Sequence, residues 1–214
     1  MYNISRLPEE LGAVKLAGFD PASSPEPFSA LNTACVDKFR WTDSGFEPET
    51  FARVGYNSSG LYVLMWSMDP DVDVNDATRF GGDVYLDSCM EFFFTPDPAY
   101  DRRYINIEAN ARAVVHIGIG EGRENRRVLS SPPPGFESGV YVKDGELWAL
   151  YYHVPTAFIK SEFPRFAPER DRVMRGNFFK CNVTAHTHYG MWIDTLTPTP
   201  DFHRPERFGE MALC

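Results

Sequence analysis

The chain has 214 residues, of which 43% are hydrophobic and 24% are charged, which is enough for one globular domain with its own core. Lys and Arg number 21 against 30 Asp and Glu, so the formal net charge at pH 7 is −9. A protein that binds phosphate backbones needs a basic face, so this charge argues against a nucleic-acid partner. The longest apolar runs fall well short of the roughly 18 residues that span a bilayer, and we expect no membrane partner.

The N-terminus and the cysteines bear on the cellular compartment. The first ten residues contain no basic segment followed by an apolar one, so we expect a cytoplasmic protein, or a secreted one if the natural start lies elsewhere. No two cysteines form a C-x-x-C pair, and in a reducing compartment they are predicted to be free thiols in or near the core. They are Cys35, Cys89, Cys181 and Cys214.

Short runs of aromatic and β-branched residues, separated by turns rich in proline and glycine, indicate an all-β fold. Residues 1–47 are predicted to be an irregular lead-in packed on the domain. The strands expected after it are 51–56, 61–68, 88–94, 103–109, 112–117, 139–143, 146–154, 177–184, 190–194 and 210–213. Residues 155–160 are predicted to form a short helical turn, with Pro155 at its start.

Two turns indicate how neighbouring strands pair. Asn57-Ser-Ser-Gly60 joins the first two strands, and Asp144-Gly145 is a strong hairpin signal between 139–143 and 146–154. Segments 130–136 and 161–175 are predicted to be surface loops. We therefore expect a single domain, residues 1–214, built as an antiparallel two-sheet β-sandwich, jelly-roll or immunoglobulin-like, with about ten strands and few short helical turns.

Three sets of residues could hold a metal or a cofactor. Asp69, Asp71 and Asp73 place oxygen atoms at alternate positions, as a calcium site does, but the loop lacks the glycine and glutamate of a helix–loop–helix site. A solvated acidic loop and a structural calcium site both remain open, and no cofactor is expected to be required. His186 and His188 would face one way in a strand, as a zinc pair or as ordinary hydrogen-bonded histidines. A third alternative is haem bound by Met65, Met68 and His153.

Carboxylates interrupt two of the apolar strands. Glu91 and Glu108 each stand between apolar neighbours, where a carboxylate is costly unless it faces a cleft or is hydrogen-bonded. With Asp87 they are candidates for the acid and base of glycoside hydrolysis. Ligand binding and the wet face of a strand explain the same pattern.

Aromatic residues make up 14% of the chain, and Tyr85 and Phe202 stand in turn-like contexts. A pyranose ring offers an apolar C–H face to an aromatic ring and hydroxyl groups to carboxylates and amides. Aromatic rings beside acidic side chains therefore suit a sugar ligand.

Four motifs in order resemble the carbohydrate-binding module family 9, over residues 48–213. They are Leu61-Tyr-Val-Leu64 with the acidic loop after it, Asp87-Ser-Cys-Met-Glu-Phe-Phe-Phe94, Tyr104-Ile-Asn-Ile-Glu-Ala-Asn110 and Asp201-Phe-His-Arg-Pro-Glu-Arg-Phe-Gly209. The resemblance implies a β-sandwich that holds a sugar, often by its reducing end, between two aromatic rings. It also implies structural calcium.

The resemblance implies a set of sugar-binding residues. The two rings would be Tyr85 and Phe202, where sugar-binding members have tryptophan. The polar contacts would come from Glu91, Asn106, Glu108 and His203, and the family's arginine near these strand positions is replaced.

The function favoured is non-catalytic carbohydrate binding, associated with carbohydrate catabolism. Its partners would be a mono- or oligosaccharide and a separately encoded glycoside hydrolase. Two alternatives remain: a glycoside-cleaving enzyme that uses Glu91, Glu108 or Asp87, and an interaction domain with a vestigial sugar site.

Overall fold

The computed structural model describes residues 1–42, 44–70, 72, 78–184 and 186–214. The strands are β1 (Tyr2–Arg6), β2 (Ala34–Val36), β3 (Lys38–Phe39), β4 (Thr50–Asn57), β5 (Gly60–Ser67), β6 (Cys89–Thr95), β7 (Tyr104–Asn110), β8 (Val115–Gly120), β9 (Arg127–Val128), β10 (Glu137–Lys143), β11 (Leu147–Pro155), β12 (Val173–Asn182), β13 (His188–Met191) and β14 (Gly209–Leu213). The helices are α1 (Thr156–Glu162) and the single 3-10 turns η1 (Pro21–Ser23), η2 (Phe28–Ala30), η3 (Val84–Leu86) and η4 (Pro205–Arg207). Within the described residues, no helix is long and apolar enough to cross a membrane.

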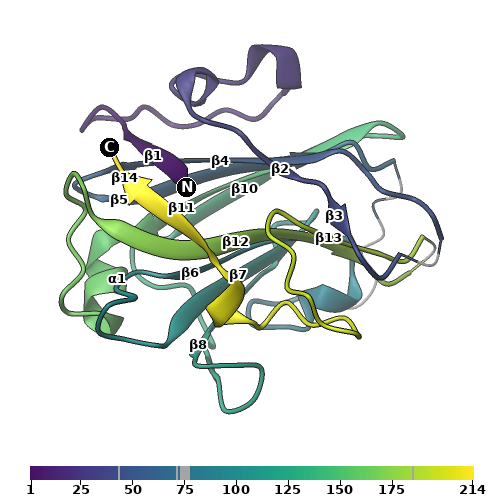
Figure 1. The fold of residues 1–214 in the computed structure, drawn as a ribbon. Helices are drawn as coiled ribbons and strands as arrows, with labels where there is room; N and C mark the ends of the chain where they lie inside the picture. Colours follow the sequence, from purple (N-terminus) through teal and green to yellow (C-terminus); the bar gives the residue numbers. More distant parts are fainter. Residues whose placement is uncertain (43, 71, 73–77, 185) are drawn as a thin grey trace.

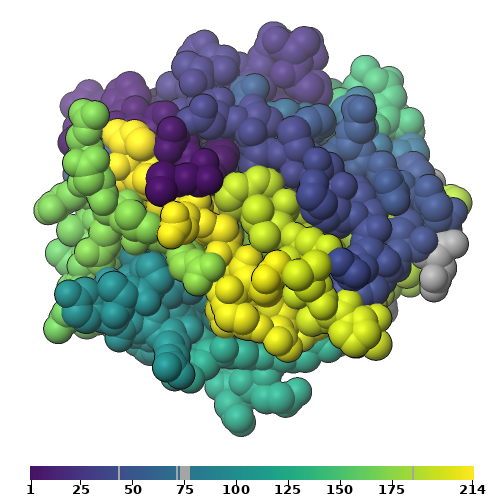
Figure 2. Space-filling view, in the orientation of Figure 1, coloured from purple at the N-terminus to yellow at the C-terminus, as the bar shows by residue number. Residues whose placement is uncertain are grey.

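The strands form one curled sheet along the path β10-β11-β5-β4-β1-β14-β12-β6-β7-β8-β9 (Figure 1). Strand β1 runs parallel to both of its neighbours, β14 and β4, and so joins the two halves of the sheet. The two ends of the chain therefore lie side by side, as Figure 2 shows.

The all-β class is confirmed, but the prediction of two antiparallel sheets with about ten strands is wrong. The sheet is mixed and has fourteen strands in the described part of the chain. The segment 1–47, expected to be irregular, supplies β1, β2 and β3. Parallel pairing joins strands that are remote in sequence, so no hairpin turn in the sequence predicts it.

The main core lies between the two halves, and β5 is buried on both of its faces. Leu61, Val63 and Met65 belong to the main core. Their neighbours at alternate positions belong to a second cluster, which includes Phe19 and Phe28 of the N-terminal segment. Burial on both faces explains why this strand is a continuous apolar run rather than an alternating one.

Both predicted hairpins are confirmed. The β4–β5 hairpin closes at the pair Asn57 and Gly60. The β10–β11 hairpin closes at Lys143 and Leu147, and Gly145 in its turn has a φ of +68°, a left-handed conformation that glycine adopts without strain. The predicted loop 130–136 is confirmed, whereas the predicted loop 161–175 is shorter because α1 extends to Glu162 and β12 begins at Val173.

Candidate functional site

The candidate site lies on the face of β6 and β7 that points away from the main core. Successive side chains along a strand point to opposite faces. Phe92 and Ile107 therefore enter the core, while Glu91 and Glu108 face the other way. The two glutamates stand directly opposite each other in the β6–β7 pairing. The residues that break the apolar pattern of their strands thus meet on one surface.

A cavity of about 640 Å³ opens on this face, a size typical of small-ligand sites. Its floor comes from β6, β7, β8 and β12, and its walls come from the segment around η3, the β8–β9 loop and the loop before η4. The lining residues are Asp83, Tyr85, Leu86, Glu91, Glu108, His116, Arg123, Arg126, Val128, Cys181, Val183, Tyr189, Pro200, Asp201, Phe202 and His203.

Most of the residues expected to bind sugar are brought together in this cavity. Those that line it are Tyr85, Glu91, Glu108, Phe202 and His203. Asn106 is fully buried and does not line the cavity; its Nδ2 donates to Oε1 of Glu108 at 2.8 Å. Asn106 therefore positions Glu108 in this structure.

The two predicted aromatic rings differ in their surroundings. Tyr85 is 48% exposed, whereas Phe202 is only 7% exposed. The Phe202 ring stacks on Phe179 with the centroids 4.2 Å apart, so at most one of its faces remains for a ligand. Tyr189, which the sequence analysis did not find, also lines the cavity and meets Phe202 edge to face. The aromatic wall thus has one open ring, Tyr85, and two largely covered ones.

Both glutamates are almost completely buried, and burial changes their protonation. Desolvation raises the pKa of Glu91 well above its usual value, and the nearby Glu108 and Cys181 raise it further. Desolvation also raises the pKa of Glu108, while His116 and Arg126 act in the opposite direction. Because a protonated carboxyl donates a hydrogen bond and a carboxylate accepts one, this pair can offer both to a ligand.

Two histidines of the cavity have complementary hydrogen-bonding atoms. Burial and Arg126 lower the pKa of His203 to about 3, so its ring is neutral near pH 7. Its Nδ1 accepts from the Tyr104 hydroxyl at 2.7 Å and from Arg126 at 3.2 Å, which leaves the proton on Nε2. The Nδ1 of His116 donates to the carbonyl of Gly82 at 3.1 Å, and its Nε2 has no hydrogen-bond partner among the described residues.

The sequence analysis missed the arginines of the cavity. Arg126 lies 3.9 Å from Glu108, and Arg123 lies 3.5 Å from Asp201. A Cβ atom at Gly120 would come within 2.8 Å of the Arg126 side chain, so the glycine allows this close approach. A charged loop after a glycine-rich strand carries no sequence signal for that position.

Two other groups of candidate residues are not brought together. Asp87 is fully buried, accepts from Asn110 at 2.9 Å and does not line the cavity, so the catalytic alternative loses one of its carboxylates. The haem alternative is wrong. Met65 lies in the main core, whereas His153 stacks on Tyr62, which belongs to the cluster on the opposite face of β5.

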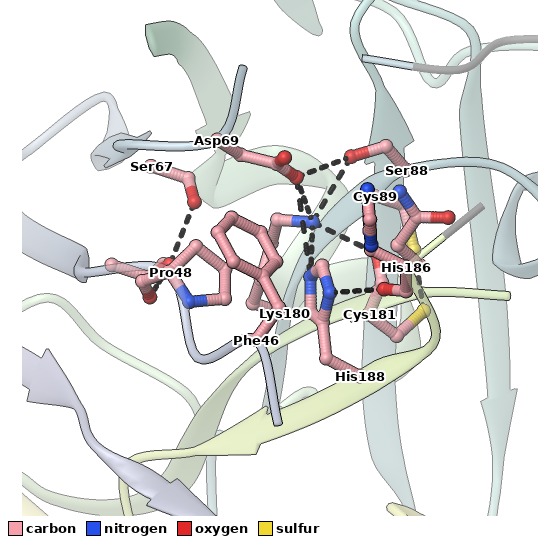
Figure 3. Close-up of polar contacts among 12 residues, drawn as sticks. Phe46, Pro48, Ser67, Asp69, Ser88, Cys89, Lys180, Cys181, His186 and His188 are labelled. Atoms are coloured by element: carbon pink, nitrogen blue, oxygen red, sulfur yellow. Dashed lines mark hydrogen bonds and ion pairs between the residues drawn. The ribbon is translucent and has the colours of Figure 1, made fainter. Parts of the chain in front are cut away.

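A buried polar cluster accounts for the histidine pair (Figure 3). Lys180 Nζ lies 2.8 Å from Asp69 Oδ2 and donates to His188 Nε2 at 2.9 Å. His188 Nδ1 donates to the carbonyl of His186 at 2.6 Å. Burial and the neighbouring Lys180 lower the pKa of His188 to about 4. Both ring nitrogens of His188 are in use, so the zinc-pair alternative is wrong and the hydrogen-bonded alternative is confirmed.

Of the three residues of the calcium alternative, only Asp69 belongs to the described residues. Asp71 and Asp73 lie outside the described residues. The charge of Asp69 is compensated by Lys180, and its Oδ2 also accepts from Ser88 at 3.1 Å. Calcium at this loop stays a prediction.

Comparisons with known proteins place the chain in a family and relate its fold to solved structures. The model of "Carbohydrate-binding family 9" matches residues 27–132 and 143–213. No curated protein matches the chain. One similar solved structure is a "putative carbohydrate-binding protein" from Bacteroides uniformis ATCC 8492, with 22% identity, a TM-score of 0.79 and coverage of 100% of this chain and 99% of that one.

A family 9 module from Caldicellulosiruptor kristjanssonii is similar in two solved complexes, each 12% identical and covering 99% of this chain. The complex with glucose has a TM-score of 0.66 over 94% of that chain, and the complex with cellotriose has 0.65 over 92%. These structures show a shared fold. Because the family model covers most of its sequence, the chain belongs to carbohydrate-binding family 9.

Proposed function

We propose that the cavity binds one end of a mono- or oligosaccharide without cleaving it. The observation that carries the proposal is the convergence, in a family 9 chain, of the exposed Tyr85 ring with the Glu91–Glu108 pair in one cavity. The ring suits the C–H face of a pyranose, and the polar floor suits its hydroxyl groups. Relatives of the same fold have been solved with glucose and cellotriose.

The polar atoms of the cavity provide both senses of hydrogen bond. His203 can donate through Nε2, the unpartnered Nε2 of His116 can accept, and the arginines donate. A single sugar ring has about a dozen heavy atoms, so ligand efficiency limits its dissociation constant to micromolar at best, and to high micromolar or millimolar for ordinary contacts.

The placement of the glutamates supports binding over hydrolysis. A glycosidase holds its two carboxyl groups on either side of the scissile bond. Here Glu91 and Glu108 are directly opposite on adjacent strands, so their Cβ atoms lie about 4.5–5.5 Å apart on one floor. Oε1 of Glu91 also accepts from the thiols of Cys89 and Cys181.

Weak binding to one ring has a consequence for the biological role. Tight attachment to a polysaccharide needs several linked sites. A role beside a separately encoded glycoside hydrolase in carbohydrate catabolism is therefore part of the proposal. The free cysteines suit a reducing compartment such as the cytoplasm.

Calorimetry against glucose, cellobiose and cellotriose tests the proposal. Tyr85→Ala should weaken binding by about tenfold or more, because it removes an aromatic surface of the cavity. Tyr100→Ala is the matched control, since this tyrosine is 71% exposed and does not line the cavity. No heat from folded protein at millimolar sugar would refute the proposal.

An assay of sugar release from oligosaccharides separates binding from catalysis. Absence of turnover in the wild type, with saturable binding, is the expected result. Turnover that is lost in Glu108→Gln while binding persists would replace the binding proposal with a glycoside-cleaving one.

A further inference from the structure

Two thiols and a carboxylate meet at the floor of the cavity. Cys89 on β6 and Cys181 on β12 are directly opposite in the strand pairing, and their sulfur atoms lie 3.2 Å apart (Figure 3). Glu91 follows Cys89 by two positions on the same strand and so faces the same side. Its Oε1 is 3.2 Å from the sulfur of Cys89 and 3.5 Å from that of Cys181.

We propose that Cys89, Glu91 and Cys181 bind a zinc ion at the floor of the cavity. Zinc forms bonds of about 2.3 Å to thiolate sulfur and about 2.0–2.2 Å to carboxylate oxygen, in tetrahedral geometry. These lengths separate the ligand atoms by about 3.6–3.8 Å. The three atoms of this chain therefore need to move apart by only a few tenths of an ångström to accommodate the ion.

The chemistry of the three groups favours a divalent cation. All three side chains are buried acids, and among the described residues Glu91 has no ion-pair partner. A zinc ion would compensate two of the three negative charges that two thiolates and one carboxylate carry. Thiolate ligands also select zinc over the hard cations calcium and magnesium.

One coordination position would remain open. Glu91 and Cys181 line the cavity, so the fourth position of the ion faces it and can hold water or a ligand hydroxyl. Binding replaces three water ligands of the aquated ion by two Zn–S bonds and one Zn–O bond, and the two thiol protons, together with the carboxyl proton of any protonated Glu91, leave to solvent without any change of oxidation state. Oε1 of Glu91 faces the sulfurs, so its Oε2 remains for a ligand in the cavity.

Titration of reduced, chelator-treated protein with Zn²⁺ or Co²⁺ tests the proposal in the absence of sugar. We expect one equivalent of metal, and for Co²⁺ a sulfur-to-metal charge-transfer absorption with the intense d–d bands of a tetrahedral site. Cys89→Ser and Cys181→Ser should each weaken metal affinity by about 100-fold or more, since they remove a direct ligand. Glu91→Gln should weaken affinity while the charge-transfer absorption persists.

The two exposed cysteines supply matched controls. Cys35→Ser and Cys214→Ser should leave affinity and spectrum unchanged. Metal uptake without charge-transfer absorption, or lost only in these controls, would overturn the proposal. If the wild type takes up no metal and its mass readily falls by that of two hydrogen atoms, Cys89 and Cys181 form a disulfide instead. The Co²⁺ spectrum of the wild type tests the zinc proposal even if a serine variant fails to fold. Its result does not depend on whether the protein binds sugar.

Discussion

Replacing Lys180 by methionine removes the cation from an ion pair in which both side chains are 0% exposed. The Nζ atom lies 2.8 Å from Oδ2 of Asp69. Coulomb's law with an effective dielectric constant of about 20 gives an attraction of roughly 6 kcal/mol at that distance. Desolvation offsets part of it, and breaking a buried pair costs about 3–5 kcal/mol. The free energy of unfolding should fall by that amount, because the substitution removes the attraction between Lys180 and the buried charge of Asp69.

Urea unfolding followed by tryptophan fluorescence measures this loss. With a slope of about 2–3 kcal/mol per molar urea, the midpoint should drop by roughly 1–2.5 M. Lys143→Met is the matched control, because Lys143 pairs with Glu146 where both are half exposed, and it should cost less than about 1 kcal/mol. The double variant Asp69→Leu/Lys180→Met should recover more than half of the loss. A Lys180→Met midpoint within error of the wild type would refute the reasoning.

Three further substitutions address the cavity. Burial and the neighbouring arginines lower the pKa of His203 from 6.5 to about 3, so the unfolded chain takes up the proton first and stability is lost as the pH falls below about 6.5. His203→Gln should flatten the dependence of the thermal denaturation midpoint on pH in this range, and an unchanged slope would contradict the assignment. A Cβ at Gly118 would lie 2.5 Å from Oδ1 of Asn106, the residue opposite it on β7, so Gly118→Ala should displace that side chain and weaken sugar binding. Gly139→Ala should leave sugar binding unchanged, because a Cβ there would have nothing within 4 Å. Calorimetry compares the two variants. Phe202→Ala should lower the free energy of unfolding by about 3–5 kcal/mol in denaturant, because the ring is buried. Tyr85→Ala should lower it by less than about 0.5 kcal/mol, and equal losses in the two variants would count against the difference in burial.

Much of the candidate site follows from local sequence pattern. Side chains alternate between the two faces of a strand, so Glu91 and Glu108 stand out as charged residues in strands that are otherwise apolar. The hairpins follow from the turn residues, because a two- or three-residue connection brings the two strands beside it together. Tyr85 and Phe202 stood out by their turn-like contexts, the resemblance to family 9 implied that they are the two sugar-binding rings, and both line the cavity.

The burial of individual side chains could not be predicted in this way. Phe202 is covered by Phe179 on β12 and meets Tyr189 on β13, elements that fold against it from other parts of the chain. Asn106 has the same strand direction as Glu108, yet it is buried behind the cavity. Exposure depends on what packs on top of a strand, and neighbouring residues in sequence do not carry that information.

By itself, the sequence determined the all-β class, the main strands after residue 47 and the two glutamates that interrupt them, because turn chemistry and side-chain alternation act over a few residues. Only the tertiary structure decided that β1 joins the halves in parallel, that Arg126 reaches the cavity, and that Cys89 meets Cys181. Cys89 and Cys181 are 92 residues apart in the chain. Such contacts depend on how remote segments pack together, and no local pattern specifies which remote partner a residue will meet.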